Sequence, residues 1–158
     1  MAALSPSALA LLQVLSLLDN DKIPQSILFK YADNVTLPNY PQSQEACCSA
    51  IAELSLHALI TMGPILGEIQ IHPLVQDAVR EQFSNEEKSA VFEAAVHLLR
   101  NPAEFIELDL NNHEQELAQL FRHMLKLVEI SGACTISGKF EPSTRSAIAD
   151  MLIHMAWY

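Results

Sequence analysis

Basic residues are in short supply in this chain. Its 158 residues include 9 Lys and Arg against 19 Asp and Glu, which gives a formal net charge of −10. A surface with this balance repels the phosphates of nucleic acids and the headgroups of anionic lipids. The shortage of cations therefore argues against DNA and membranes as partners.

Cysteines and long hydrophobic runs are also scarce. Cys47, Cys48 and Cys134 form an odd set with two members adjacent, which is typical of a reducing compartment rather than of a disulfide framework. The apolar stretch from Ser7 to Leu18 is short for a membrane span, and it lacks the basic flank and cleavage site of a signal peptide. We expect an intracellular, cytoplasmic protein whose apolar half forms a proper core.

Signatures of common enzymes are missing as well. No His-Glu-x-x-His, Cys-x-x-Cys or Gly-x-Ser-x-Gly pattern occurs. The segment closest to a phosphate loop, 132–140, has too many residues between its glycines, and Phe140 replaces the Ser or Thr that binds the metal. We expect the chain alone to bind no cofactor and no metal. Cys47 and Cys48 are expected on a buried helix face, as core residues rather than nucleophiles.

What the sequence does contain is a series of helix signals. The first predicted helix begins at Ser5-Pro6 and ends at the Asp19-Asn20-Asp21 turn, and a second opens at Pro24 and continues to about residue 32. After a loop over 33–43, a third helix is predicted over 44–60. Its expected buried residues are Cys47, Ala50, Ile51, Leu54, Ala58 and Leu59.

A change of hydrophobic period at His72 is the most informative feature. Ile69 and Ile71 alternate with polar residues, so 59–62 and 69–71 predict a β-hairpin around a Gly-Pro turn. A helix follows, with Pro73 at its first position. Its apolar residues at helical spacing are Leu74, Val75, Ala78, Val79 and Phe83. The free N–H groups of a helix N-terminus attract anions, so His72 is a candidate phosphate contact, with an ordinary capping or packing role as the alternative.

The second half of the chain predicts further helices. Ser84 with Glu87 has the pattern of a capping box and opens a helix that Pro102 stops. A later helix and a last one follow, and the last stops in mid-pattern at Trp157-Tyr158, without a cap. These two aromatic residues are expected to need a partner, from another chain or from a continuation of the same element.

The segment Ile71-His72-Pro73-Leu74-Val75-Gln76 resembles the Met-His-Asp motif of the nucleotide-binding signalling ATPases of the NB-ARC/STAND type, which are NLR-like proteins. In that superfamily the motif begins the last helix of a winged-helix domain, and its histidine touches the phosphate of bound ADP. The fungal branch that carries tetratricopeptide (TPR) arrays is similar also over Leu15 to Asp19 and over Ile71 to Arg80.

This resemblance implies a mainly α-helical fold with two parts. Residues 1–83 form a winged-helix domain of three helices, a β-hairpin wing at about 59–71 and a further helix. Residues 84–158 form a helical, TPR-like extension, the truncated start of a repeat array. His72 is then an ancestral ADP-phosphate sensor, and ADP or ATP is held by a partner nucleotide-binding domain because the chain has no phosphate loop. Pro73 departs from the motif, so the side-chain contact made from that position is lost.

We therefore expect a non-enzymatic regulatory and interaction module of a nucleotide-switch signalling protein. Its expected partners are proteins, namely a nucleotide-binding domain or helical repeats, and Trp157 and Tyr158 are the expected interaction residues. A winged-helix DNA-binding protein is one alternative, although no Lys or Arg occurs between Tyr31 and Val79. A small helical enzyme with dispersed site residues is the other. A fragment, a decayed relative and a small adaptor all fit the chain standing alone.

Overall fold

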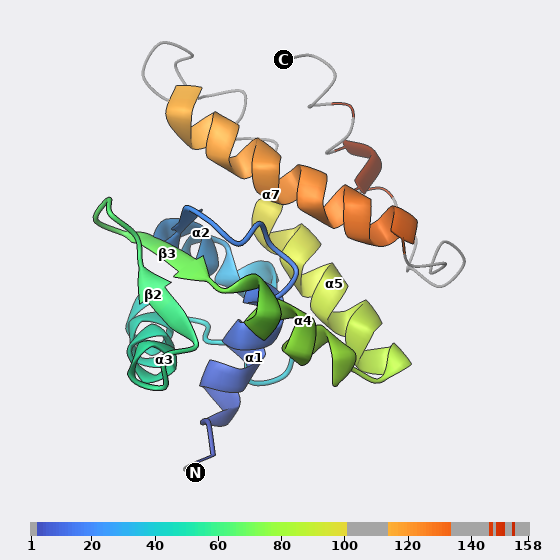
Figure 1. The fold of residues 1–158 in the computed structure, drawn as a ribbon. Coiled ribbons are helices and arrows are strands. Elements are labelled where there is room, and N and C mark those ends of the chain that lie inside the picture. Colours follow the sequence, from blue (N-terminus) through green and yellow to red (C-terminus); the bar gives the residue numbers. More distant parts are fainter. Residues whose placement is uncertain (1–2, 101–113, 134–145, 147, 151–152, 154–158) are drawn as a thin grey trace.

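The computed structural model describes residues 3–100, 114–133, 146, 148–150 and 153. The described chain is mainly helical with one small sheet (Figure 1), so the predicted mainly α class is confirmed. The elements are α1 (Pro6–Leu15), β1 (Ile23–Pro24), α2 (Gln25–Lys30), the 3₁₀ helix η1 (Ala32–Asn34), α3 (Gln44–Leu56), β2 (Ile60–Met62), β3 (Glu68–Ile71), α4 (Pro73–Glu81), α5 (Asn85–Leu99) and α7 (Glu114–Ala133).

The sheet has three antiparallel strands in the order β1-β3-β2. The predicted hairpin is present as β2 and β3, with Ile60 opposite Ile71. The strand β1 was not predicted, because two residues are too few for a visible alternation. Pro24 lies in this edge strand, where a missing N–H is tolerated, so the prediction that it opens a helix was wrong by one residue.

Helix α1 forms the centre of the core. It contacts α3, α4 and α5, and six of its ten residues are buried. The helix α5 packs on α1, α2 and η1, so its buried residues belong to the same hydrophobic cluster as those of α1. The division of the chain into 1–83 and 84–158 stays a prediction, and α5 contributes to the core of the first part.

Two predicted helix ends were wrong. The structure ends α1 at Leu15, although Leu17 and Leu18 in the following turns remain buried. The helix α3 ends at Leu56 rather than at residue 60, because Ala58 has a positive φ of 56° that breaks the helix and turns the chain into β2. Ala58 is exposed and Leu59 is half-buried, so these two do not extend the buried face of α3.

The N-terminus of α1 is tied to α3 by a carboxylate. Ser5 caps α1 by accepting from the Ala8 N–H, and its own N–H and hydroxyl both donate to the Glu53 carboxylate at 2.6 Å. These two hydrogen bonds favour the ionised acid, so they lower the pKa of Glu53. The tie therefore depends on an ionised Glu53.

Replacing Glu53 by Gln is expected to lower the melting temperature at pH 7, because an amide cannot accept from both Ser5 donors in the same way. The folded-state pKa of Glu53 is depressed, so its stabilising effect is present above the unfolded pKa and is lost as the pH falls through the folded pKa. Thermal unfolding of both proteins over an acidic pH series measures this. A melting temperature difference that stays constant with pH would contradict the assignment.

Candidate functional site

His72 lies at the junction between β3 and α4 and is itself the N-cap of α4. Its Nδ1 accepts from the Leu74 N–H at 3.1 Å, and its side chain is exposed. Because Nδ1 is the acceptor, the proton of the neutral ring is on Nε2. The capping role considered from the sequence is therefore observed, and the same ring offers an N–H to an outside acceptor. The phosphate contact stays a prediction.

The apolar residues that recur at helical spacing along α4 are buried only in part. Leu74 is 70% exposed and Ala78 is exposed, whereas Val75 and Val79 are half-buried and Phe83 is 8% exposed. The residue that α4 buries most deeply is a polar one, Gln76, which is 3% exposed. Helix α4 is therefore rotated relative to an orientation in which only its apolar residues would face the core.

Gln76 and Arg80 account for this rotation. The Gln76 amide donates to the carbonyls of Leu15 at 3.0 Å and Leu18 at 2.9 Å, and Arg80 donates to the carbonyl of Ser16 at 2.6 Å. The last carbonyls of a helix have no partner within it, and they favour a nearby cation. Helix α4 thus caps the C-terminal end of α1. Sequence reasoning missed Gln76, and only its place one turn after His72 hinted at a role.

The turn after α1 is also fixed by β3 on one side. The Ile71 N–H donates to the carbonyl of Asn20 at 3.0 Å, and Gln70 donates to the Asp21 carboxylate at 2.5 Å. His72 directly follows Ile71 in sequence. The start of α4 is therefore held by the same turn that follows α1.

Helix α7 reaches this turn from the other side. His123 is 1% exposed, and its Nδ1 accepts from the Asp19 N–H at 3.2 Å. Burial lowers the pKa of His123 from 6.5 to about 4, while the Asp19 carboxylate opposes the shift. One turn earlier, Gln119 donates at 2.8 Å to Glu68, which is 5% exposed. These polar contacts therefore join α7 to the sheet and to the turn, while its apolar residues pack on α5.

These polar contacts are incomplete within the described part of the chain. Nε2 of His123 and Oε2 of Glu68 are buried there without a hydrogen-bond partner. A buried polar atom in this state costs about 1–3 kcal/mol. The apolar residues Met124 and Leu127, each 1% exposed, offset the cost on the same helix.

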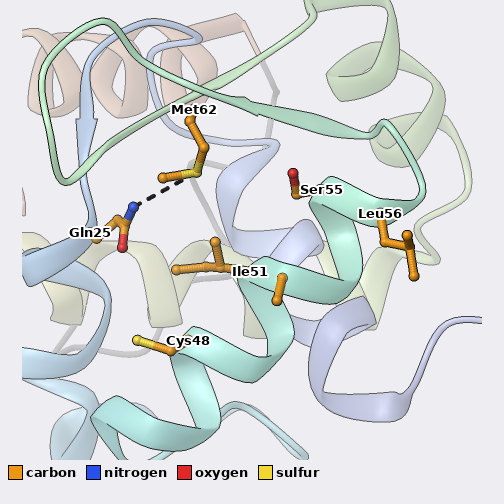
Figure 2. Close-up of a pocket in the computed structure, with 7 residues that line it drawn as sticks. Gln25, Cys48, Ile51, Ser55, Leu56 and Met62 are labelled. Carbon is orange, nitrogen blue, oxygen red and sulfur yellow. Dashed lines mark hydrogen bonds between the residues drawn. The ribbon is translucent and has the colours of Figure 1, made fainter.

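A groove of about 470 Å³ lies between α3 and β2 (Figure 2). The ribbon places α3 away from α7 (Figure 1). Figure 2 shows the side chains of α3 along one wall and Met62 above them. The labelled lining residues are Gln25, Cys48, Ile51, Ser55, Leu56 and Met62. Cys48 is exposed in this groove, so the prediction that it packs in the core was wrong, whereas Cys47 is buried.

The described residues give little chemistry for catalysis. They contain no group of three His, Cys, Asp or Glu side chains placed to hold a metal ion. Burial raises the pKa of the Cys47 thiol to about 12, which disfavours the nucleophilic thiolate. Within the same described ranges, no helix is both long and apolar enough to cross a membrane.

Some predicted features fall outside the described residues. These are Trp157 and Tyr158, most of the loop at 132–140, and the predicted opening of a repeat at the C-terminus. Their roles stay predictions.

Residues 1–88 match the model of a family described as a domain of unknown function (DUF7779). The match covers more than half of the chain and includes every element from α1 to α4, so the chain belongs to this family. No curated protein and no solved structure matches the chain.

Replacing Gln76 by Leu keeps the side-chain volume but removes the donors to the end of α1. The Leu18 carbonyl then lies buried without this partner, so the free energy of unfolding is expected to fall by about 2–3 kcal/mol. Urea unfolding measures it. Gln82→Leu, at the exposed end of α4, is the control and should change stability by less than about 0.5 kcal/mol. Equal effects of the two variants would contradict the capping role of Gln76.

His123 makes the stability depend on pH. Its folded-state pKa is depressed, so its stabilising effect is complete above the unfolded pKa of 6.5 and is lost as the pH falls toward about 4. The loss amounts to roughly 3 kcal/mol, since one pKa unit corresponds to about 1.4 kcal/mol. Urea unfolding at several pH values between about 4 and 6.5 gives the free energy of unfolding of the wild type and of His123→Gln. This free energy should change less with pH in the variant than in the wild type. The exposed His57→Gln is the control, and a wild-type slope in His123→Gln would refute the assignment.

Proposed function

We propose that this member of the DUF7779 family is a regulatory and interaction module of an NLR-like signalling protein that is switched by nucleotide. In this proposal residues 1–83 are a winged-helix domain, and a partner nucleotide-binding domain holds the ADP. His72 contacts the ADP phosphate, and the chain itself performs no catalysis. The helical part after residue 83 makes protein contacts, with Trp157 and Tyr158 as the proposed interaction residues.

The order of the elements supports the winged-helix assignment. A helix, a short strand, two helices, a β-hairpin and a further helix follow one another, and the first strand joins the edge of the hairpin. The β2–β3 turn is then the wing, and α4 is the helix that the Met-His-Asp motif begins in the NB-ARC/STAND superfamily.

The observation that carries the proposal is the placement of His72. Its ring lies exposed at the N-terminus of a helix, with Nδ1 occupied by the Leu74 N–H and Nε2 left to donate outward. The positive end of the α4 dipole lies at the same place and adds a partial positive charge. Because Gln76 and Arg80 fix α4 to α1, the imidazole is held in place before any phosphate arrives. A fixed donor of this kind favours an anion over a neutral group.

The contacts of the turn after α1 supply a physical route from this site to α7. The turn bonds to Ile71, next to His72, and to His123 of α7. A movement of the α4 N-terminus therefore strains the contact on which α7 rests. If this turn has two arrangements and ADP favours one of them, the bound nucleotide shifts the position of α7 through the turn.

The charge distribution disfavours the DNA-binding alternative. The helix that enters the major groove in a DNA-binding winged helix would be α3, and the chain has no Lys or Arg from residue 32 to residue 79. Glu45 is exposed on this helix. Neither steering nor counterion release would favour binding.

Sequencing the transcript across both ends of the reading frame should identify the protein that joins this chain to a nucleotide-binding domain. Variants of His72 in that protein then test the proposal. His72→Ala is expected to release ADP about tenfold faster, because one hydrogen bond to a charged group is worth roughly 1.5 kcal/mol or more. His72→Asn keeps the N-cap but lacks the imidazole. It should also release ADP faster, with an unchanged melting temperature.

The exposed His57→Ala, at the end of α3, is the matched control and should release ADP at the wild-type rate. Wild-type ADP release by His72→Asn would show that His72 is only a cap and would overturn the sensor role. A transcript that spans only Met1 to Tyr158 would contradict a switch contained in one chain.

A further inference from the structure

The exposed side of α3 is unusually apolar where it faces β2. Leu56 is 85% exposed and Met62 is 52% exposed, and both border the groove. In Figure 2 the Gln25 amide points toward the Met62 sulfur, which lies over the groove. Leu56 is the last residue of α3, and the positive φ of Ala58 turns the chain away before it can cover this side chain.

The lining is adaptable as well as apolar. Met62 and Cys48 contribute soft, polarisable sulfur atoms, and an unbranched methionine fits itself to different apolar shapes. Ile51, 6% exposed, forms the floor and belongs to the hydrophobic core. The groove therefore has a floor that belongs to the core and an exposed apolar rim, which suits the apolar side of a helix.

The charge near the groove indicates which kind of partner helix would bind there. Glu45 is exposed on the same side of α3 as Cys48 and Ala52, at helical spacing. Glu53 is bonded to Ser5, Glu68 is buried against Gln119, and Asp77 pairs with Arg80, so Glu45 is the acidic side chain available on this side of α3. From residue 32 to residue 79 the chain contains no Lys or Arg. Lys30, at the end of α2, lies over the Tyr31 ring at 5.7 Å. An occupant with Lys or Arg beside its apolar stripe is attracted here, whereas a second copy of this chain, with a net charge of −10, is repelled.

We propose that the groove between α3 and β2 docks a basic amphipathic helix of a protein partner. Apolar side chains of the partner enter between Leu56 and Met62, and its cations lie near Glu45. A helix laid along the 13 residues of α3 covers about 20 Å, or about four turns of partner. Docking at this groove requires neither His72 nor a nucleotide, so it stands apart from the phosphate-sensing role.

A peptide titration of the full chain tests this docking. The probe is a synthetic helical peptide of about fourteen residues, with Leu at positions i, i+3, i+4 and i+7 of each repeat and Lys elsewhere. A matched peptide carries Glu in place of Lys. At about 0.15 M salt, fluorescence anisotropy should show binding of the Lys peptide only, and amide NMR shifts should map to α3 and β2.

Leu56→Gln and Met62→Gln are each expected to weaken binding at least about tenfold, because each removes an apolar contact without changing the charge. Both side chains are more than half exposed, so the fold should persist. Leu125→Gln on α7, where Leu125 is 53% exposed, is the control and should bind as the wild type does.

Three results would overturn the assignment. Wild-type binding by both Leu56→Gln and Met62→Gln would show that the peptide binds by overall charge alone. Shifts that map away from α3 and β2 would place the binding surface elsewhere. A dimer in analytical ultracentrifugation that Leu56→Gln abolishes would assign the groove to a second copy of this chain.

Discussion

The C-terminal end of α1 is the constraint on which the rest of this structure depends. This end lies in the core, because Leu15 and Leu18 are fully buried, so its last carbonyls have no water to bond. Gln76 and Arg80 supply the missing donors from α4. The buried Gln76 amide is thus stabilised by the carbonyls of Leu15 and Leu18, and its two hydrogen bonds fix the position of α4 against α1.

Much of the candidate site follows from this one junction. With α4 fixed, its N-cap His72 has a defined place and direction, and β3 is held against the turn after α1 through Ile71. The same turn receives His123 from α7. Helix α7 packs on α5 through its apolar residues, and its His123 contact brings it next to the proposed phosphate sensor.

The groove between α3 and β2 differs in character from the polar junction at the end of α1. It is lined mainly by apolar side chains, and no described element covers Leu56. The chain has no Lys or Arg from residue 32 to residue 79.

The sequence by itself determined the local elements. The Ser84–Glu87 capping box, the Ser5-Pro6 start of α1 and the Gly-Pro turn of the hairpin depend on neighbouring residues, and each is present as predicted. Only the tertiary structure decided which side of α4 turns inward, that Cys48 is exposed and that His123 is buried. Hydrophobic period shows where an apolar face lies, but it does not show where a distant helix ends. The burial of Gln76 depends on carbonyls about sixty residues earlier in the chain.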